Sequence, residues 1–96
     1  MIVRFRSEAT SDVLLAREWY DGQRPGLGDD FVRSLEQVIN LMSELPEAFP
    51  EIAVGLRRGL LGRFPYAVYY RLNGNHLEVI ACLHTRRSPS GWRNRG

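Results

Sequence analysis

The hydrophobic pattern of this chain changes its period once, at the proline-bounded segment 46–50. Before that segment, apolar residues recur at helical spacing over about residues 8–21 and again from about residue 27 or 28 to 45, with turn residues at 21–26 between them. After it, apolar residues alternate with polar ones, as in strands. The predicted strands are 2–6, 56–61, 66–72 and 77–84. The order β-α-α-β-β-β predicts an α+β fold, an antiparallel sheet with an N-terminal helix hairpin packed on one face.

Each predicted helix carries an apolar stripe that should face the sheet. In the first helix Leu14 widens the stripe, and Ser7 is placed to act as the N-cap. The first stripe consists of Ala9, Val13, Ala16 and Tyr20, and the second of Leu27, Phe31, Leu35, Val38, Ile39, Met42 and Leu45. The aromatic residues expected in the core are Trp19, Tyr20, Phe31, Tyr66 and Tyr70.

The last two predicted strands should form a hairpin, because Asn73-Gly74-Asn75 separates them. In a regular register one face contacts the helices through Tyr66, Val68, Tyr70, Leu72, Leu77, Val79, Ala81 and Leu83. The opposite face carries Ala67, Tyr69, Arg71, Glu78, Ile80, Cys82 and His84. Because that face is half-polar, we expect part of it to meet solvent or a partner. Arg71 and Glu78 should form a cross-strand ion pair.

Length and composition indicate one domain over residues 1–96. The chain is 44% apolar and 25% charged, as in globular proteins, and its apolar runs are far shorter than the roughly 20 residues of a membrane span. Cys82 is the lone cysteine and cannot form an internal disulfide, so we expect a reducing, cytoplasmic location. No metal-ligand spacing and no glycine-rich phosphate loop occurs, so we expect no metal and no cofactor.

The net charge of +2 conceals an uneven distribution. Residues 1–54 carry five Arg against ten acidic residues, whereas residues 55–96 carry eight Arg against Glu78 alone. All 13 basic residues are Arg, whose planar guanidinium suits bidentate binding of phosphate or carboxylate. The basic second half points to a nucleic acid or an acidic protein partner, and a solvated basic face is the alternative.

Three segments together carry a resemblance to a known family. They are Trp19-Tyr20 with Pro25-Gly26-Leu27-Gly28 and Phe31, then Arg63-Phe64-Pro65-Tyr66-Ala67-Val68-Tyr69-Tyr70, and finally His84-Thr85-Arg86-Arg87-Ser88-Pro89 with Trp92. In this order, on a βααβββ pattern, the chain resembles the RelE/ParE superfamily of bacterial toxins from type II toxin–antitoxin pairs. The second and third segments are most similar to the ParE-like branch.

The resemblance implies two mechanisms on one fold. ParE-like toxins inhibit DNA gyrase by binding it, whereas RelE-like toxins are ribosome-dependent mRNA endonucleases. Both are neutralised by a cognate antitoxin whose C-terminal segment folds onto the toxin. The expected partners are therefore an antitoxin and either gyrase or the ribosome, in a homodimer or a toxin–antitoxin hetero-oligomer, with no membrane association.

RelE-like enzymes place Lys and Arg on the middle strands, an Arg at the end of the last strand and a Tyr six residues later. Here Arg86 matches the last-strand Arg, but Trp92 and Tyr66 stand at two of the other places, and the chain has no Lys. We therefore expect a toxin that acts by binding, and leave its status as an enzyme open. If it is a ribonuclease, His84 and Arg86 are the candidate catalytic residues; a structural hydrogen bond is the alternative role for His84.

The expected contacts with a target or antitoxin combine the basic group with nearby rings and apolar residues. They are Arg57, Arg58, Arg63, Tyr69, Ile80, Arg86, Arg87 and Trp92. For Trp92 we favour packing against the domain, with an exposed anchor as the alternative. A non-toxic regulatory or nucleic-acid-binding descendant of the fold remains a third functional interpretation.

Overall fold

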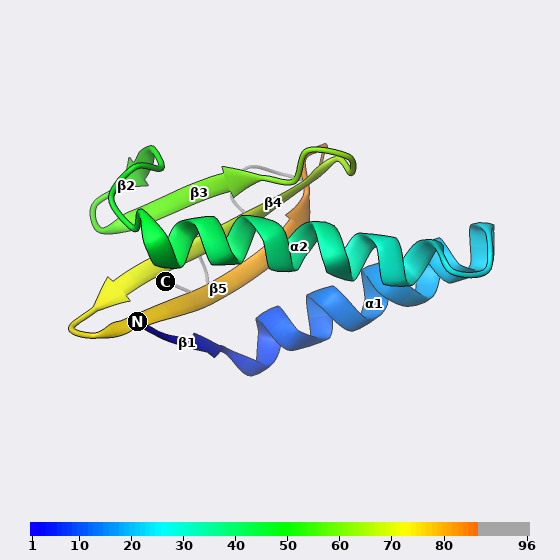
Figure 1. Ribbon diagram of the computed structural model, residues 1–96, viewed down its shortest axis with the longest axis horizontal. Helices are drawn as coiled ribbons and strands as arrows, with labels where there is room; N and C mark the ends of the chain where they lie inside the picture. The colour runs from blue at the N-terminus through cyan, green and yellow to red at the C-terminus, as the bar shows by residue number, and fades with distance from the viewer. Residues whose placement is uncertain (87–96) are drawn as a thin grey trace.

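The protein is described here from a computed structural model, which describes residues 1–86. Within residues 1–86, seven helices and strands follow one another (Figure 1). They are β1 (Ile2–Phe5), α1 (Ser7–Gln23), α2 (Leu27–Glu44), β2 (Glu51–Ala53), β3 (Leu56–Leu60), β4 (Tyr66–Asn73) and β5 (His76–His84). No helix in this part of the chain is long and apolar enough to cross a membrane.

The strands form one sheet in the order β1-β5-β4-β3-β2. β1 pairs parallel with β5 and all other pairs are antiparallel, while both helices lie on one face as a hairpin (Figure 1). This confirms the predicted α+β class and adds β2, which is too short to give an alternating pattern in the sequence. Gly55 turns the chain from β2 into β3 with a φ of 71°, a conformation that side chains disfavour.

The stripe of α2 is buried as predicted except at its end, where Leu45 is exposed. The stripe of α1 is less well predicted, because Ala9, Ala16 and Tyr20 are buried but Leu14 and Trp19 are exposed. On a helix that turns about 100° per residue, the last two project to opposite sides of the buried stripe. The helix also begins at Ser7 itself, with Arg6 as the N-cap residue, so the predicted cap is one residue off.

A bulge in β5 reverses the predicted faces of its second half. Tyr69 pairs with Ala81 and Tyr70 with Val79, which leaves Ile80 as an extra residue. Because side chains alternate along a strand, every residue after the bulge changes face. Cys82 and His84 therefore face the helices, and Ala81 and Leu83 face away, contrary to the prediction.

The face of the sheet away from the helices has a core of its own. Its buried residues are Leu56, Ala67, Tyr69, Ile80, Ala81 and Leu83. Tyr69 is 6% exposed and Ile80 is fully buried, so the expectation that this face offers them to solvent or a partner is wrong. The predicted Arg71–Glu78 ion pair is also absent among residues 1–86: Glu78 pairs with Arg6 at 3.2 Å, and Arg71 donates to the Val54 carbonyl at 3.1 Å.

Two side chains hold the segment between α2 and β2 against the sheet. The Tyr70 hydroxyl donates to the Pro46 carbonyl at 2.8 Å, and Arg57 Nη1 donates to the carbonyls of Glu47 and Phe49 at 3.1 and 2.7 Å. Arg57 and Tyr70 are paired in the register of β3 and β4, so they act side by side. Burial raises the pKa of Tyr70, which keeps its hydroxyl protonated as a donor.

Tyr70→Phe removes this hydroxyl and leaves the Pro46 carbonyl without its donor. We expect the free energy of unfolding to fall by about 1 kcal/mol, as measured by urea denaturation at neutral pH. Tyr20→Phe is the matched control, because Tyr20 is buried too and its hydroxyl has no hydrogen bond to a described residue. Equal losses in the two variants would show that the bond to Pro46 contributes nothing specific.

Candidate functional site

Helix α1 exposes an unusual amount of apolar surface. Leu14, Leu15 and Trp19 are 57%, 64% and 59% exposed. The adjoining strand β1 exposes Ile2 and Phe5 as well. Single exposed apolar residues are ordinary on protein surfaces, but a group of them on neighbouring elements marks an interaction site. Two grooves lie on either side of α1 and contain most of these residues.

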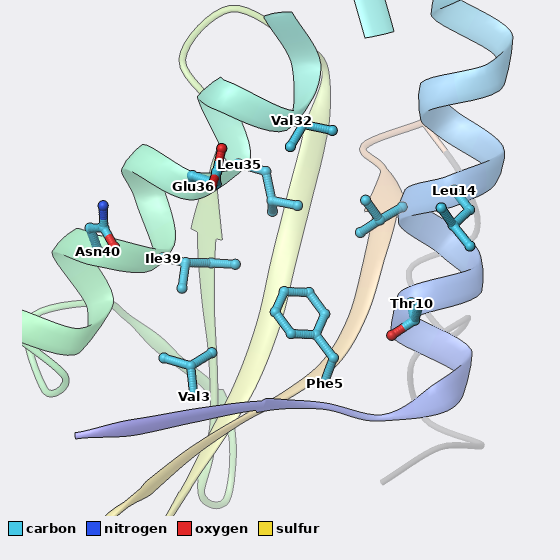
Figure 2. A pocket seen from close by; sticks show the side chains of 10 residues that line it. Val3, Phe5, Thr10, Leu14, Val32, Leu35, Glu36, Ile39 and Asn40 are labelled. Atoms are coloured by element: carbon cyan, nitrogen blue, oxygen red, sulfur yellow. The ribbon is translucent and has the colours of Figure 1, made fainter. Parts of the chain in front are cut away.

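The first, the α1–α2 groove, lies between the two helices above β1 and has a volume of about 500 Å³. Figure 2 shows Phe5 pointing into the space between the elements, with Leu35 and Ile39 of α2 facing it. Leu14 comes from α1 and Val3 from β1. The lining is almost wholly apolar, so this groove can hold an apolar face of a partner but offers little for chemistry.

The second, the α1–β5 groove, lies on the other side of α1 and has a volume of about 740 Å³. Leu15 and Trp19 of α1 form one wall. The opposite wall comes from the start of β4 and the end of β5, namely Pro65, Tyr66, Cys82, His84 and Arg86. The backbone N–H of Thr85 donates to the Pro65 carbonyl at 2.8 Å, which ties the two chain segments of this wall together.

The bulge at Ile80 is what turns His84 toward this groove, where its ring meets the ring of Tyr66 edge-on with centroids 5.3 Å apart. The backbone N–H of Arg86 donates to His84 Nδ1 at 3.1 Å. A neutral imidazole that accepts at Nδ1 carries its proton on Nε2, so this hydrogen bond assigns the tautomer. His84 therefore offers an N–H donor at Nε2, and Arg86 lines the same groove.

Asp12 of α1 accepts a hydrogen bond from a backbone N–H of β5 beside this groove. β1 pairs with β5 only as far as Val79, so the outward N–H of Cys82 has no strand partner and donates to Asp12 Oδ2 at 3.0 Å instead. Burial raises the pKa of the Cys82 thiol from 9.0 to about 12, and the Asp12 carboxylate adds to the effect. The thiol remains protonated near neutral pH and is unsuited to act as a nucleophile.

This raised pKa predicts a loss of stability in alkaline solution. Above pH 9 the unfolded chain releases the Cys82 proton while the folded chain keeps it until about pH 12, so stability falls as pH rises. We expect the loss to approach about 1.4 kcal/mol per pH unit in that range. Urea denaturation of the parent and Cys82→Ala from neutral pH to pH 10 should show a flatter profile for the variant. Parallel profiles would assign the alkaline loss to other groups.

The structure brings His84 and Arg86 together and separates the other predicted site residues from them. Arg57 is engaged by the segment after α2, and Arg58 is exposed on β3. Arg63 is exposed, lies over the Phe64 ring at 5.4 Å and is 3.9 Å from Asp30. Tyr69 and Ile80 are buried on the far face, and Arg87 and Trp92 lie outside the described residues.

Within residues 1–86, no cluster of His, Cys, Asp and Glu side chains could hold a metal ion.

Sequence reasoning missed the exposed residues of α1, although a signal for them exists. Leu14 and Leu15 are consecutive, and consecutive residues on a helix project about 100° apart, so a single buried stripe cannot take both. Trp19 stands in the same relation to the buried Tyr20, against which its ring packs edge-on at 5.0 Å. An apolar helix whose residues exceed one stripe indicates a second contact surface.

No protein-family model matches this sequence, and no curated protein matches it. Solved structures do match its α+β arrangement of a helix hairpin on a sheet. One is a chain from the structure titled "Chromosomal ParDE TA system from P. aeruginosa", which aligns with a TM-score of 0.65 over 88% of this chain and 95% of that one, at 14% sequence identity. The likeness shows that this chain and that one share a fold.

Proposed function

We propose that this protein is a ParE-like toxin of a type II toxin–antitoxin pair, which acts in the cytoplasm by binding an essential target, DNA gyrase, and is neutralised by a cognate antitoxin. The observation that carries the proposal is the exposed apolar surface of β1 and α1 with the α1–α2 groove, on a fold like that of the ParDE chain. A protein of this size gains nothing in stability by exposing such a groove, so the groove argues for a partner that covers it.

The α1–α2 groove suits an amphipathic helix of the antitoxin. Its floor is apolar, and its rim carries the polar side chains of Thr10, Glu36 and Asn40 (Figure 2). A helix laid in such a groove buries one face and leaves its polar face in water. Of the predicted binding arginines, Arg58 is exposed on β3, whereas Arg57 already holds two backbone carbonyls and Arg63 lies 3.9 Å from the Asp30 carboxylate.

Induced expression in cells tests the proposal. We expect growth to stop with filamentous cells and an SOS response while translation persists, because gyrase inhibition damages DNA rather than ribosomes. Co-expression of the cognate antitoxin should restore growth. Codon-phased mRNA cuts within minutes of induction, detected by primer extension, would overturn the gyrase mechanism.

The second candidate function is a RelE-like, ribosome-dependent mRNA endonuclease. It is favoured by one observation, that His84, Arg86 and Tyr66 line the same groove. Against it, the Nδ1 lone pair with which a neutral His84 would accept a proton already accepts the backbone N–H of Arg86. The chain also has no Lys to supply further cationic groups around a phosphate in the transition state.

A further inference from the structure

We propose that the α1–β5 groove is a second docking site, independent of the α1–α2 groove, which binds a protein segment carrying an aromatic or large apolar side chain next to a carboxylate. The two grooves are lined from opposite sides of α1, Leu14 on one side and Leu15 and Trp19 on the other. The assignment of this segment to the target, and not to the antitoxin, rests on the proposed function. The chemistry of the ligand that the groove would bind is argued from the groove alone.

The apolar part of this site is formed by Trp19, whose ring is held in place by packing against core aromatic rings. Trp19 is more than half exposed, yet its ring packs edge-on against Tyr20, which is itself buried and stacks on Phe31 at 5.4 Å. Leu15 extends the same wall by one helical turn. An exposed Trp held in place by core rings loses little side-chain freedom when a partner binds, and such residues dominate the energetics of interfaces.

The polar half of the site is a pair of donors at the end of β5. His84 and Arg86 both line the groove, and the hydrogen bond from the Arg86 backbone N–H to His84 Nδ1 orients the imidazole. Two donors, one of them cationic, match one carboxylate. The Asp12 carboxylate lies against the Cys82 N–H on the α1 side.

The charges of α1 favour a protein segment over a nucleic acid. The helix carries four acidic residues and one basic residue, Arg17. A phosphate backbone running along the groove would pass this negatively charged helix and its Asp12 carboxylate, and each nucleotide adds a negative charge. A peptide that places a single carboxylate at Arg86 avoids that repulsion.

Fragment binding to the full chain tests the site without requiring knowledge of the partner. Indole-3-acetate supplies an aromatic ring and a carboxylate, and indole-3-acetamide is its neutral match. In NMR titrations at millimolar concentration we expect the acid to shift the backbone amides of residues 12–20, 66 and 82–86 and to bind about tenfold more tightly than the acetamide. Arg86→Gln should abolish that difference, Trp19→Ala should weaken both fragments, and Leu41→Asp on the exposed side of α2 should change neither.

Several outcomes would overturn the site. Equal affinity of acid and amide would remove the carboxylate preference, and shifts confined to Val3, Phe5 and Ile39 would move binding to the other groove. A single-stranded oligonucleotide that displaces the acid would make the groove a nucleic-acid site. If the fragments bind as expected but induced expression does not stop growth, the proposed toxin function fails and the docking site stands.

Discussion

Phe31→Ala should lower the free energy of unfolding by about 3–5 kcal/mol, the range typical of a buried Phe truncated to Ala. Phe31 is fully buried, and its ring lies 5.4 Å from Tyr20, 5.4 Å from Phe64 and 5.0 Å from Tyr66. These contacts join α1, α2 and the segment that leads into β4, so the cavity would open where three parts of the chain meet. Against a total stability of about 5–15 kcal/mol, the loss is large enough to lower the melting temperature markedly.

The matched control is Phe5→Ala, which removes the same side chain from a partly exposed position on β1. We expect it to cost much less stability, because the ring is still partly hydrated in the folded protein. Urea denaturation of both variants with circular dichroism detection would compare them directly. A Phe31→Ala protein no less stable than Phe5→Ala would mean that the aromatic cluster is not the centre of the core.

The order of helices and strands could be predicted from sequence because each long element repeats its period several times. Helix α2 keeps one stripe from Phe31 to Met42, and the residues of β4 alternate between the two faces of the sheet without a break. The faces of β5 could not be predicted beyond Val79, since one extra residue, Ile80, reverses every later side chain and leaves no mark in the composition. That single bulge moves Cys82 and His84 from the far face to the groove beside α1.

The candidate site was predictable only where it is local in sequence. His84 and Arg86 are two residues apart at the end of a strand, so their proximity follows from the strand itself. The position of the opposite wall, formed by Leu15 and Trp19, could not be predicted in this way, because it depends on how α1 crosses the sheet. The contact between Asp12 and Cys82 joins residues 70 positions apart. Trp19 was assigned to the core with Tyr20, since both are aromatic and adjacent, although a helix cannot direct both to one side.

Leu14→Asp should weaken antitoxin binding by about 100-fold or more while leaving the fold intact. Leu14 lines the α1–α2 groove, and its side chain is largely exposed, so a charge there costs the free protein little. In the complex the same carboxylate would be buried against apolar side chains without a partner. Losses at the centre of an interface reach about 2–4 kcal/mol, which corresponds to a change in affinity of about 30- to 1,000-fold.

Comparing three single Leu→Asp variants makes this prediction specific to one groove. Leu14 lines the α1–α2 groove, Leu15 lines the α1–β5 groove and Leu41 lines neither, and all three are exposed on helices. Calorimetric titration with the antitoxin should therefore show a large loss for Leu14→Asp alone, at low and at high salt, because an apolar contact is not screened. In cells, only this variant should remain toxic when the antitoxin is co-expressed. Comparable losses at Leu14 and Leu41 would reflect a general effect of added charge, and an unchanged Leu14→Asp would place the antitoxin elsewhere on the protein.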